Sequence, residues 1–168
     1  PLAHNPMSLS QTLELMSPAG SYAALAAAIR AGADSVYFGV EQLNMRSRAA
    51  TPFTIDDLRR IARTCRWCGV RSHLTLNTIV YDDELPLMRE LCDTAKAAGV
   101  DAVIATDIAT IEYAHSIGLS VHISVQANIS NLAAVRFYAR YADVIVLARE
   151  LTLAQIDGIA KAIKREDM

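Results

Sequence analysis

One pattern recurs along this sequence and limits its fold more than any other feature. An alanine-rich stretch of helical length leads to a glycine, and a short run of β-branched or aliphatic residues follows. The joints lie at Gly32, Gly69, Gly99 and Gly118. A glycine in this place suits the left-handed backbone that ends a helix just before a strand. The repeat therefore predicts parallel strands that alternate with helices.

The repeat sets the expected elements from residue 13 onward. Strands are predicted over 13–16, 35–39, 71–77, 102–105, 120–125 and 143–148. Helices are predicted over about 21–31, 54–68, 83–98, 107–117, 131–141 and 152–164. Thr54 with Asp57, and Thr152 with Gln155, have the spacing of a capping box, so two of the helix starts are marked.

Alternating strands and helices build either an open doubly wound sheet or a closed barrel. No glycine-rich phosphate-binding motif follows any predicted strand, so the nucleotide-binding form of the open sheet has no support. The polar faces of three of the predicted strands favour the barrel. We therefore predict an α/β fold, an incomplete TIM-like (βα) barrel with about six β/α units and parallel strands.

The domain limits and the compartment follow from simpler features. Residues 1–12 are aperiodic and are expected to be a disordered tail or a cloning remnant, and 13–168 a single barrel domain truncated at its C-terminal side. A net charge of −2 gives no overall electrostatic attraction to nucleic acid. No apolar run reaches the roughly 20 residues of a membrane span, and three cysteines do not suggest a disulfide framework. The expected location is the cytoplasm.

Three predicted strands carry one polar face each, although both faces of a parallel sheet covered by helices should be apolar. The polar sets are Ser35, Tyr37 and Gly39; His73, Thr75 and Asn77; and His122, Ser124 and Gln126. A barrel explains them, because its inner face lines a pocket at the C-terminal rim, where barrel chemistry takes place. The alternative is a buried polar network whose members only satisfy one another.

Other candidates follow the predicted strands at the same rim. Asp107 comes after the fourth strand, and Arg149 with Glu150 after the sixth. Arg46 and Arg48 lie two apart in the loop after the second strand, where paired guanidiniums can bind carboxylates or phosphates. Each of these charges can equally be a solvated loop residue. Cys65 and Cys68 end the second helix, away from the rim, and are interpreted as structural.

Six motifs in order are similar to those of the peptidase U32 family. They are Glu14–Gly20, Gly32–Gly39, Asn44–Ala49, Asn77–Thr78, His122–Asn128 and Leu147–Leu151. The resemblance implies a TIM-like barrel and, in longer members, a further region with four cysteines for an iron–sulfur cluster. It also implies one of two kinds of activity: collagenase-like proteolysis, or oxygen-independent hydroxylation of tRNA or rRNA pyrimidines or of a ubiquinone precursor. In the RNA hydroxylases, the resemblance implies prephenate as the oxygen source.

The residues themselves bear on the choice between proteolysis and hydroxylation. The sequence has no His-Glu-x-x-His or Gly-x-Ser-x-Gly motif, and no cysteine ends a strand beside a histidine, so a protease mechanism is not visible. His122 has the best reference pKa for a general acid or base. The predicted catalytic residues are His122, Asp107 and Glu150. The predicted substrate-binding residues are Tyr37, Arg46, Arg48, Asn77, Ser124, Gln126, Asn128 and Arg149.

The preferred hypothesis is the barrel portion of an RNA-hydroxylating U32 enzyme that uses a small organic acid. The runner-up is a U32 peptidase acting on a peptide substrate, and the third is a binding module for RNA or protein without chemistry. No metal site is predicted, and no cofactor is expected in this chain, because the iron–sulfur cluster would come from the C-terminal region. An open edge between the sixth and first strands predicts that the fragment either forms a homodimer or is the ordered part of a longer chain, and the fragment alone is expected to be inactive.

Overall fold

A computed structural model describes residues 13–41, 43 and 53–166 of the chain. The strands are β1 (Met16–Pro18), β2 (Ser35–Phe38), β3 (Arg71–Leu76), β4 (Ala102–Ala105), β5 (Val121–Ile123) and β6 (Val144–Ile145). The α-helices are α1 (Tyr22–Arg30), α2 (Ile55–Trp67), α3 (Leu85–Ala98), α4 (Ile108–Ser116), α5 (Leu132–Tyr138) and α6 (Leu153–Glu166). Two short 3-10 turns, η1 (Asp82–Glu84) and η2 (Val125–Ala127), complete the described elements.

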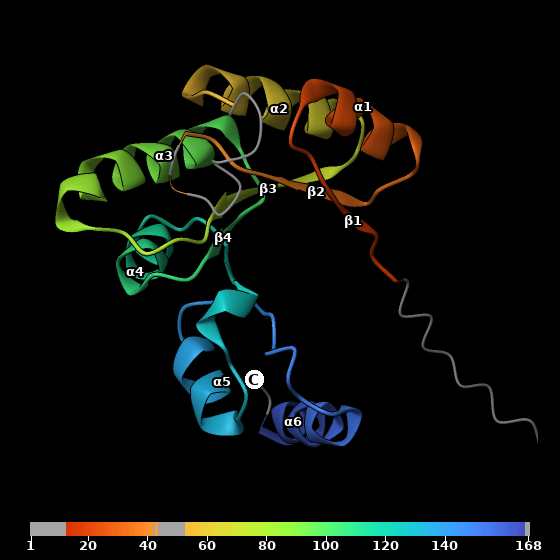
Figure 1. Ribbon diagram of the computed structural model, residues 1–168, viewed down its shortest axis with the longest axis vertical. Helices are drawn as coiled ribbons and strands as arrows, with labels where there is room; N and C mark the ends of the chain where they lie inside the picture. Colours follow the sequence, from red (N-terminus) through yellow and green to blue (C-terminus); the bar gives the residue numbers. More distant parts are fainter. Residues whose placement is uncertain (1–12, 42, 44–52, 167–168) are drawn as a thin grey trace, which may run out of the picture.

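The strands form one curled sheet in the order β1-β2-β3-β4-β5-β6, with every neighbouring pair parallel. Figure 1 shows the helices on an arc outside the strands, from α1 at the upper right to α6 at the bottom, with the concave side of the sheet facing the middle. This is a half-barrel of six β/α units. The predicted fold class is therefore confirmed.

The helix boundaries follow the local signals in the sequence. Thr54 and Asp57 form a complete capping box at the start of α2, and Thr152 and Gln155 exchange the same bonds before α6. Gly99 ends α3 with φ of 70°, a left-handed conformation that other residues adopt at a cost. These starts and stops set the alternation of strand and helix.

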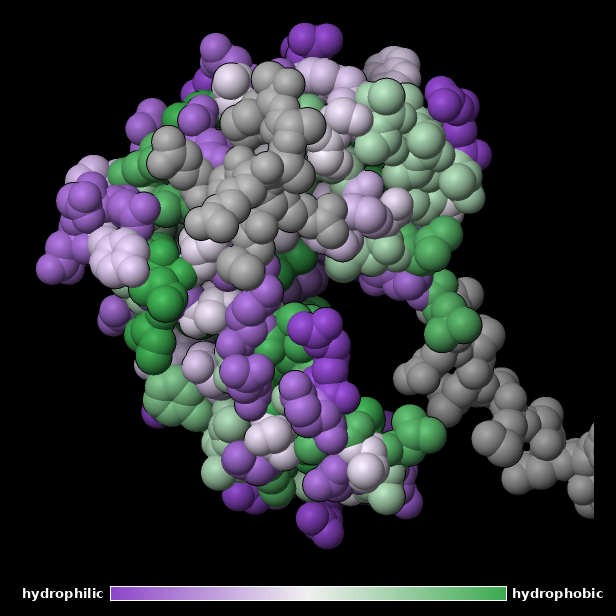
Figure 2. Space-filling view, viewed as in Figure 1, coloured by the Kyte–Doolittle hydropathy of each residue, from purple (hydrophilic) through white to green (hydrophobic). Residues whose placement is uncertain are grey.

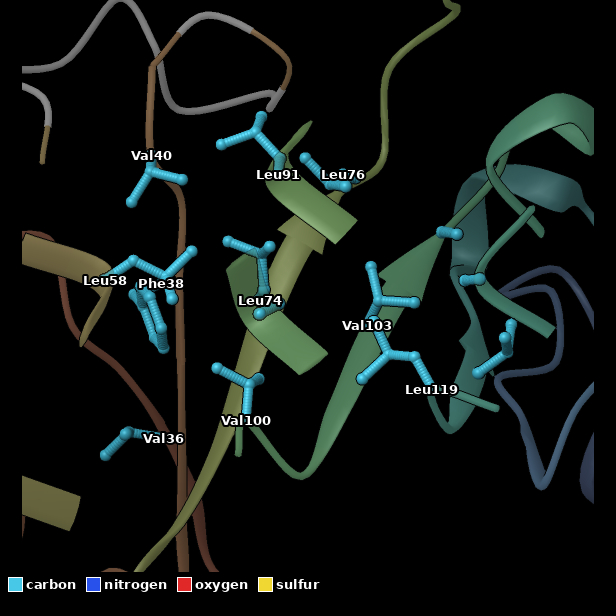
Figure 3. Close-up of a cluster of buried hydrophobic side chains, with 14 of the residues drawn as sticks. Val36, Phe38, Val40, Leu58, Leu74, Leu76, Leu91, Val100, Val103 and Leu119 are labelled. Atoms are coloured by element: carbon cyan, nitrogen blue, oxygen red, sulfur yellow. The ribbon is translucent and has the colours of Figure 1, made fainter. Parts of the chain in front are cut away.

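The apolar core lies between the outer face of the sheet and the helices. Outward-pointing residues of β2, β3 and β4, among them Phe38, Leu74 and Val103, belong to one buried cluster with Leu58 of α2 and Leu91 of α3 (Figure 3). All five are fully buried. Burying a side chain of this size stabilises the fold by about 1.5–3 kcal/mol. The sheet is therefore fixed from its convex side, and the concave side is left for a site.

Three aspartates bind successive strands together at their N-terminal ends. Asp34, Asp101 and Asp143 each precede an even-numbered strand, and each carboxylate accepts the backbone N–H of the preceding strand segment, at Leu15 (2.7 Å), Ser72 (2.7 Å) and Val121 (3.3 Å) respectively. Hydrogen bonds to a charged acceptor are stronger than neutral ones. These bonds hold the strands together in pairs at the end of the sheet opposite the predicted rim.

Several strand limits differ from those predicted. β1 begins at Met16, whereas 13–16 was predicted, and it includes Pro18 because an edge strand tolerates a residue without an N–H. β5 ends at Ile123, because the Ser124 hydroxyl accepts the N–H of Gln126 and turns the chain into η2. β6 is shorter than predicted, at Val144–Ile145. The placement of Gln126 on a strand was therefore wrong.

Candidate functional site

The concave face of the sheet carries the polar side chains that the strand parity predicted. In a parallel sheet, residues paired in register point to the same side. Tyr37 pairs with His73, and Thr75 pairs with Ile104, which in turn pairs with His122. The neighbouring strands β2, β3, β4 and β5 thus contribute to one inner surface.

A cavity of about 540 Å³ opens at the C-terminal ends of these strands. Its polar lining residues are Tyr37, Thr75, Asn77, Ser124, Gln126 and Arg149, and its apolar ones are Met16, Ile104, Val125, Val146 and Leu147. Figure 2 shows a hollow in the middle of the molecule bordered by both hydrophilic and hydrophobic residues. Five predicted substrate-binding residues, namely Tyr37, Asn77, Ser124, Gln126 and Arg149, are therefore brought together.

A chain of hydrogen bonds fixes the amide of Gln126 at this cavity. The Gln126 carbonyl oxygen Oε1 accepts from Asn77 Nδ2 at 3.2 Å and from the hydroxyl of Ser124. Ser124 is buried, at 3% exposed, so its hydroxyl holds a defined position. Two donors on one oxygen set the orientation of the amide and leave Gln126 Nε2 to donate to a ligand.

The remaining polar groups of the cavity also favour a ligand rich in acceptors. Arg149 is exposed and brings a permanent positive charge to the wall. The Thr75 hydroxyl donates to the carbonyl of Phe38 at 2.8 Å and so belongs to the scaffold. None of the described residues that line the cavity is Asp, Glu, His or Cys. The lining can bind an anion or a base edge and offers no strong acid or base.

The two histidines of the inner face lie outside this lining. The rings of His73 and His122 meet edge to face, with centroids 4.8 Å apart. His73 is 2% exposed, and its Nδ1 has no hydrogen-bond partner in the described part of the chain. Burial, and then the neighbouring His122, lower the pKa of His73 to about 4. Burial also lowers the pKa of His122. Both imidazoles are therefore neutral near pH 7.

The other two residues predicted to be catalytic are placed differently. Asp107 caps α4: its carboxylate accepts from Ala109 N at 2.9 Å and from Val80 N at 3.3 Å. Glu150 is exposed and is not among the residues that line the cavity. None of His122, Asp107 and Glu150 lines the cavity, and the carboxylate of Asp107 has a structural role at the start of α4.

Asn128, predicted to bind substrate, closes the η2 turn. Its φ is 51°, its N–H donates to the Val125 carbonyl, and it does not line the cavity. Asparagine is one of the few residues that adopt this conformation at low cost. Arg46 and Arg48 lie outside the described residues.

The cysteines do not form a metal site. Cys65 and Cys92 are buried, Cys68 is exposed at the end of α2, and burial raises the pKa of the Cys65 thiol to about 11. The described residues contain no group of three or more His, Cys, Asp or Glu side chains that could hold a metal ion. A cluster of four thiolates also needs more cysteines than the three in the sequence. The residues present do not fit an iron–sulfur cluster.

Sequence reasoning missed the apolar half of the cavity wall and the close contact of His73 with His122. Met16, Ile104 and Val146 line the cavity, but the parity argument considered only the polar faces of the second, third and fifth strands, and the part that these apolar residues play depends on the curvature of the sheet. The anchoring aspartates had a visible signal, because each directly precedes an even-numbered strand.

Comparisons with known proteins agree on one family. The profile of Peptidase family U32 matches residues 20–167. The chain is 54% identical over 155 residues to a protein named collagenase from Porphyromonas gingivalis, covering 92% of this chain and 37% of that protein. It is 35% identical over 154 residues to the 23S rRNA 5-hydroxycytidine C2501 synthase of Escherichia coli, covering 91% of this chain and 23% of that protein.

The fold has a counterpart among solved structures. The U32 peptidase Mk0906 superimposes with a TM-score of 0.72 at 17% identity, covering 94% of this chain and 68% of that one. At this identity the likeness shows the fold alone. The chain spans well under half of the length of the two curated relatives.

Proposed function

The chain belongs to peptidase family U32, and from that premise we propose that it forms the substrate-binding half-barrel of an enzyme that hydroxylates pyrimidines in tRNA or rRNA. A small organic acid such as prephenate would supply the oxygen. The rRNA-modifying relative supports this branch. The observation that carries the proposal is the lining of the cavity. It offers a guanidinium, two amides and hydroxyls, and none of the described lining residues is a base that could activate a hydroxyl as a nucleophile.

The lining suits such substrates chemically. Arg149 can pair with the carboxylate of an organic acid or with a phosphate, and guanidinium groups do this through two parallel hydrogen bonds. The Nε2 donor of Gln126, held by Asn77 and Ser124, can read the acceptor edge of a base. The cavity would thus bind and orient the organic acid and the base, and the redox chemistry would come from a part of the enzyme outside these residues.

An iron–sulfur cluster remains part of this proposal, with its ligands outside these 168 residues, since the described cysteines do not fit one. No described helix has the length and apolarity of a membrane span, and the proposed location is the cytoplasm. The edge strands β1 and β6 carry exposed Met16 and Val144, which supports the proposed association of two chains through these edges.

The test is mass spectrometry of RNA from a strain that lacks the gene. We expect one hydroxylated pyrimidine to disappear, to return with the wild-type gene, and to fall at least tenfold with Arg149→Gln, because a lost charge-assisted hydrogen bond of about 1.5–3 kcal/mol reduces binding by about that factor. Arg140→Gln, on the exposed surface of α5–β6, is the matched control and should restore the modification. Unchanged RNA in the deletion strain would contradict the proposal.

A second candidate is a U32 peptidase, favoured by the 54% identity to the Porphyromonas gingivalis collagenase. Cleavage of gelatin or casein by the purified protein, lost with Arg149→Gln and retained with Arg140→Gln, would favour it. Binding of RNA without either activity would favour a binding module.

A further inference from the structure

The outer face of α2 carries an unusual concentration of positive charge for a chain with a net charge of −2. Four arginines, Arg59, Arg60, Arg63 and Arg66, and the only tryptophan of the sequence, Trp67, occupy this helix. At 3.6 residues per turn the five side chains fall within an arc of about 120°. The buried residues Leu58, Ile61, Ala62 and Cys65 occupy the other side. We call the five residues the α2 arginine face.

The position of α2 connects this face with the candidate site. Phe53, just before the helix, forms a bridge with Val40, just beyond the C-terminal end of β2, and its carbonyl accepts the N–H of Glu41 at 2.9 Å. Its buried ring packs edge to face against Phe38 in the core. The helix therefore starts at the rim of the half-barrel. Its far end, at Trp67, leads into β3 at the opposite edge of the sheet. The α2 arginine face thus runs from the rim down the outer wall.

Part of the charge has a structural explanation. Arg66 donates to the carbonyls of Ala98 and Gly99 at 2.8 and 3.0 Å, which closes the end of α3. Arg59 pairs with Asp56 at 3.3 Å, an exposed contact of small value. These two arginines are accounted for by the fold.

Arg60, Arg63 and Trp67 are not accounted for in this way. The Arg60 guanidinium lies over the ring of Tyr22 at 4.6 Å and interacts electrostatically with Asp57, and the residue is exposed. Arg63 is exposed and has no ion-pair partner among the described residues. Trp67 is 91% exposed, although an indole ring is among the side chains that gain most from burial.

Guanidinium groups interleaved with an exposed aromatic ring are the chemistry of single-stranded nucleic acid binding. The cations contact successive phosphates, and a base stacks on the ring. We propose that the α2 arginine face binds the backbone of an RNA strand that leaves the cavity at the rim, with Arg60 and Arg63 on phosphates and Trp67 beneath a base. This proposal rests on the RNA-modifying function proposed above and adds the path of the substrate on the protein.

Trp67 supplies a direct readout, because all tryptophan fluorescence of the chain comes from it. Titration with oligouridylate should quench this fluorescence as a base stacks on the ring. Trp67→Ala should weaken binding of a fluorescein-labelled oligouridylate roughly tenfold, the usual effect of losing one base stack. Arg63→Glu should weaken binding and lower the slope of log affinity against log salt by about 0.7, the value for one phosphate contact on a single strand.

Lys164→Glu, the same charge reversal on the exposed surface of α6, is the matched control and should leave affinity and salt slope unchanged. Circular dichroism of each variant checks that the fold is kept. Oligouridylate binding without quenching, or binding that Arg63→Glu and Lys164→Glu weaken equally, would overturn the proposal, and so would absence of binding.

The result is separable from that of the proposed function. If the hydroxylated pyrimidine is lost in the deletion strain but Trp67→Ala does not change the affinity for fluorescein-labelled oligouridylate, the proposed enzymatic function stands and the proposed RNA path along α2 is wrong. If oligouridylate quenches the Trp67 fluorescence but the RNA of the deletion strain keeps all its hydroxylated pyrimidines, the α2 arginine face binds RNA and the proposed hydroxylation is wrong.

Discussion

The stability of the chain should fall below neutral pH because of His73. Its pKa is lowered from 6.5 to about 4 in the folded state, chiefly by burial. The unfolded chain therefore takes up the proton first, and stability is lost as the pH falls from about 6.5 through about 4. Each pKa unit corresponds to about 1.4 kcal/mol, so the histidine accounts for a loss of roughly 3 kcal/mol over this interval.

Equilibrium urea unfolding of wild type and His73→Leu, at pH 7 and at pH 4, measures this loss. The leucine fills the inner face without a titrating group, so the variant should lose roughly 3 kcal/mol less than wild type over this interval. His115→Leu removes an exposed histidine on α4 and should keep the wild-type dependence. Equal pH dependence of wild type and His73→Leu would refute the assignment of the effect to the buried imidazole.

Two further predictions concern the scaffold. Asp101→Ala should lower the free energy of unfolding by about 1–3 kcal/mol, because the N–H and hydroxyl of Ser72 lose a charged acceptor at 2.7 and 3.1 Å. Thermal unfolding measures this loss, and Asp83→Ala, at an exposed position, is the control that should change the stability little. Leu74→Ala, at a fully buried position, should cost about 2–5 kcal/mol in urea unfolding, and a smaller loss would mean that the core behind β3 collapses around the gap.

Much of the fold was predictable because its signals are local. A glycine that permits a left-handed φ ends α3 at the expected place, and the bonds between Thr54 and Asp57 depend on residues three apart. Strand parity also separated Leu74, which faces the helices, from Thr75, which faces the hollow. These features need only the chain near each residue, so the sequence determines the units, their order and the sides that they bury.

The candidate site depended on contacts between units, which no local signal encodes. His73 on β3 and His122 on β5 are separated by β4, and in a flat sheet two strand spacings are roughly 9–10 Å. Their ring centroids lie 4.8 Å apart, since the curled sheet and the length of the side chains bring the inner face together. The same convergence joins Asn77 to Gln126. Only the tertiary structure decided this, because the curvature comes from packing all six strands and their helices at once.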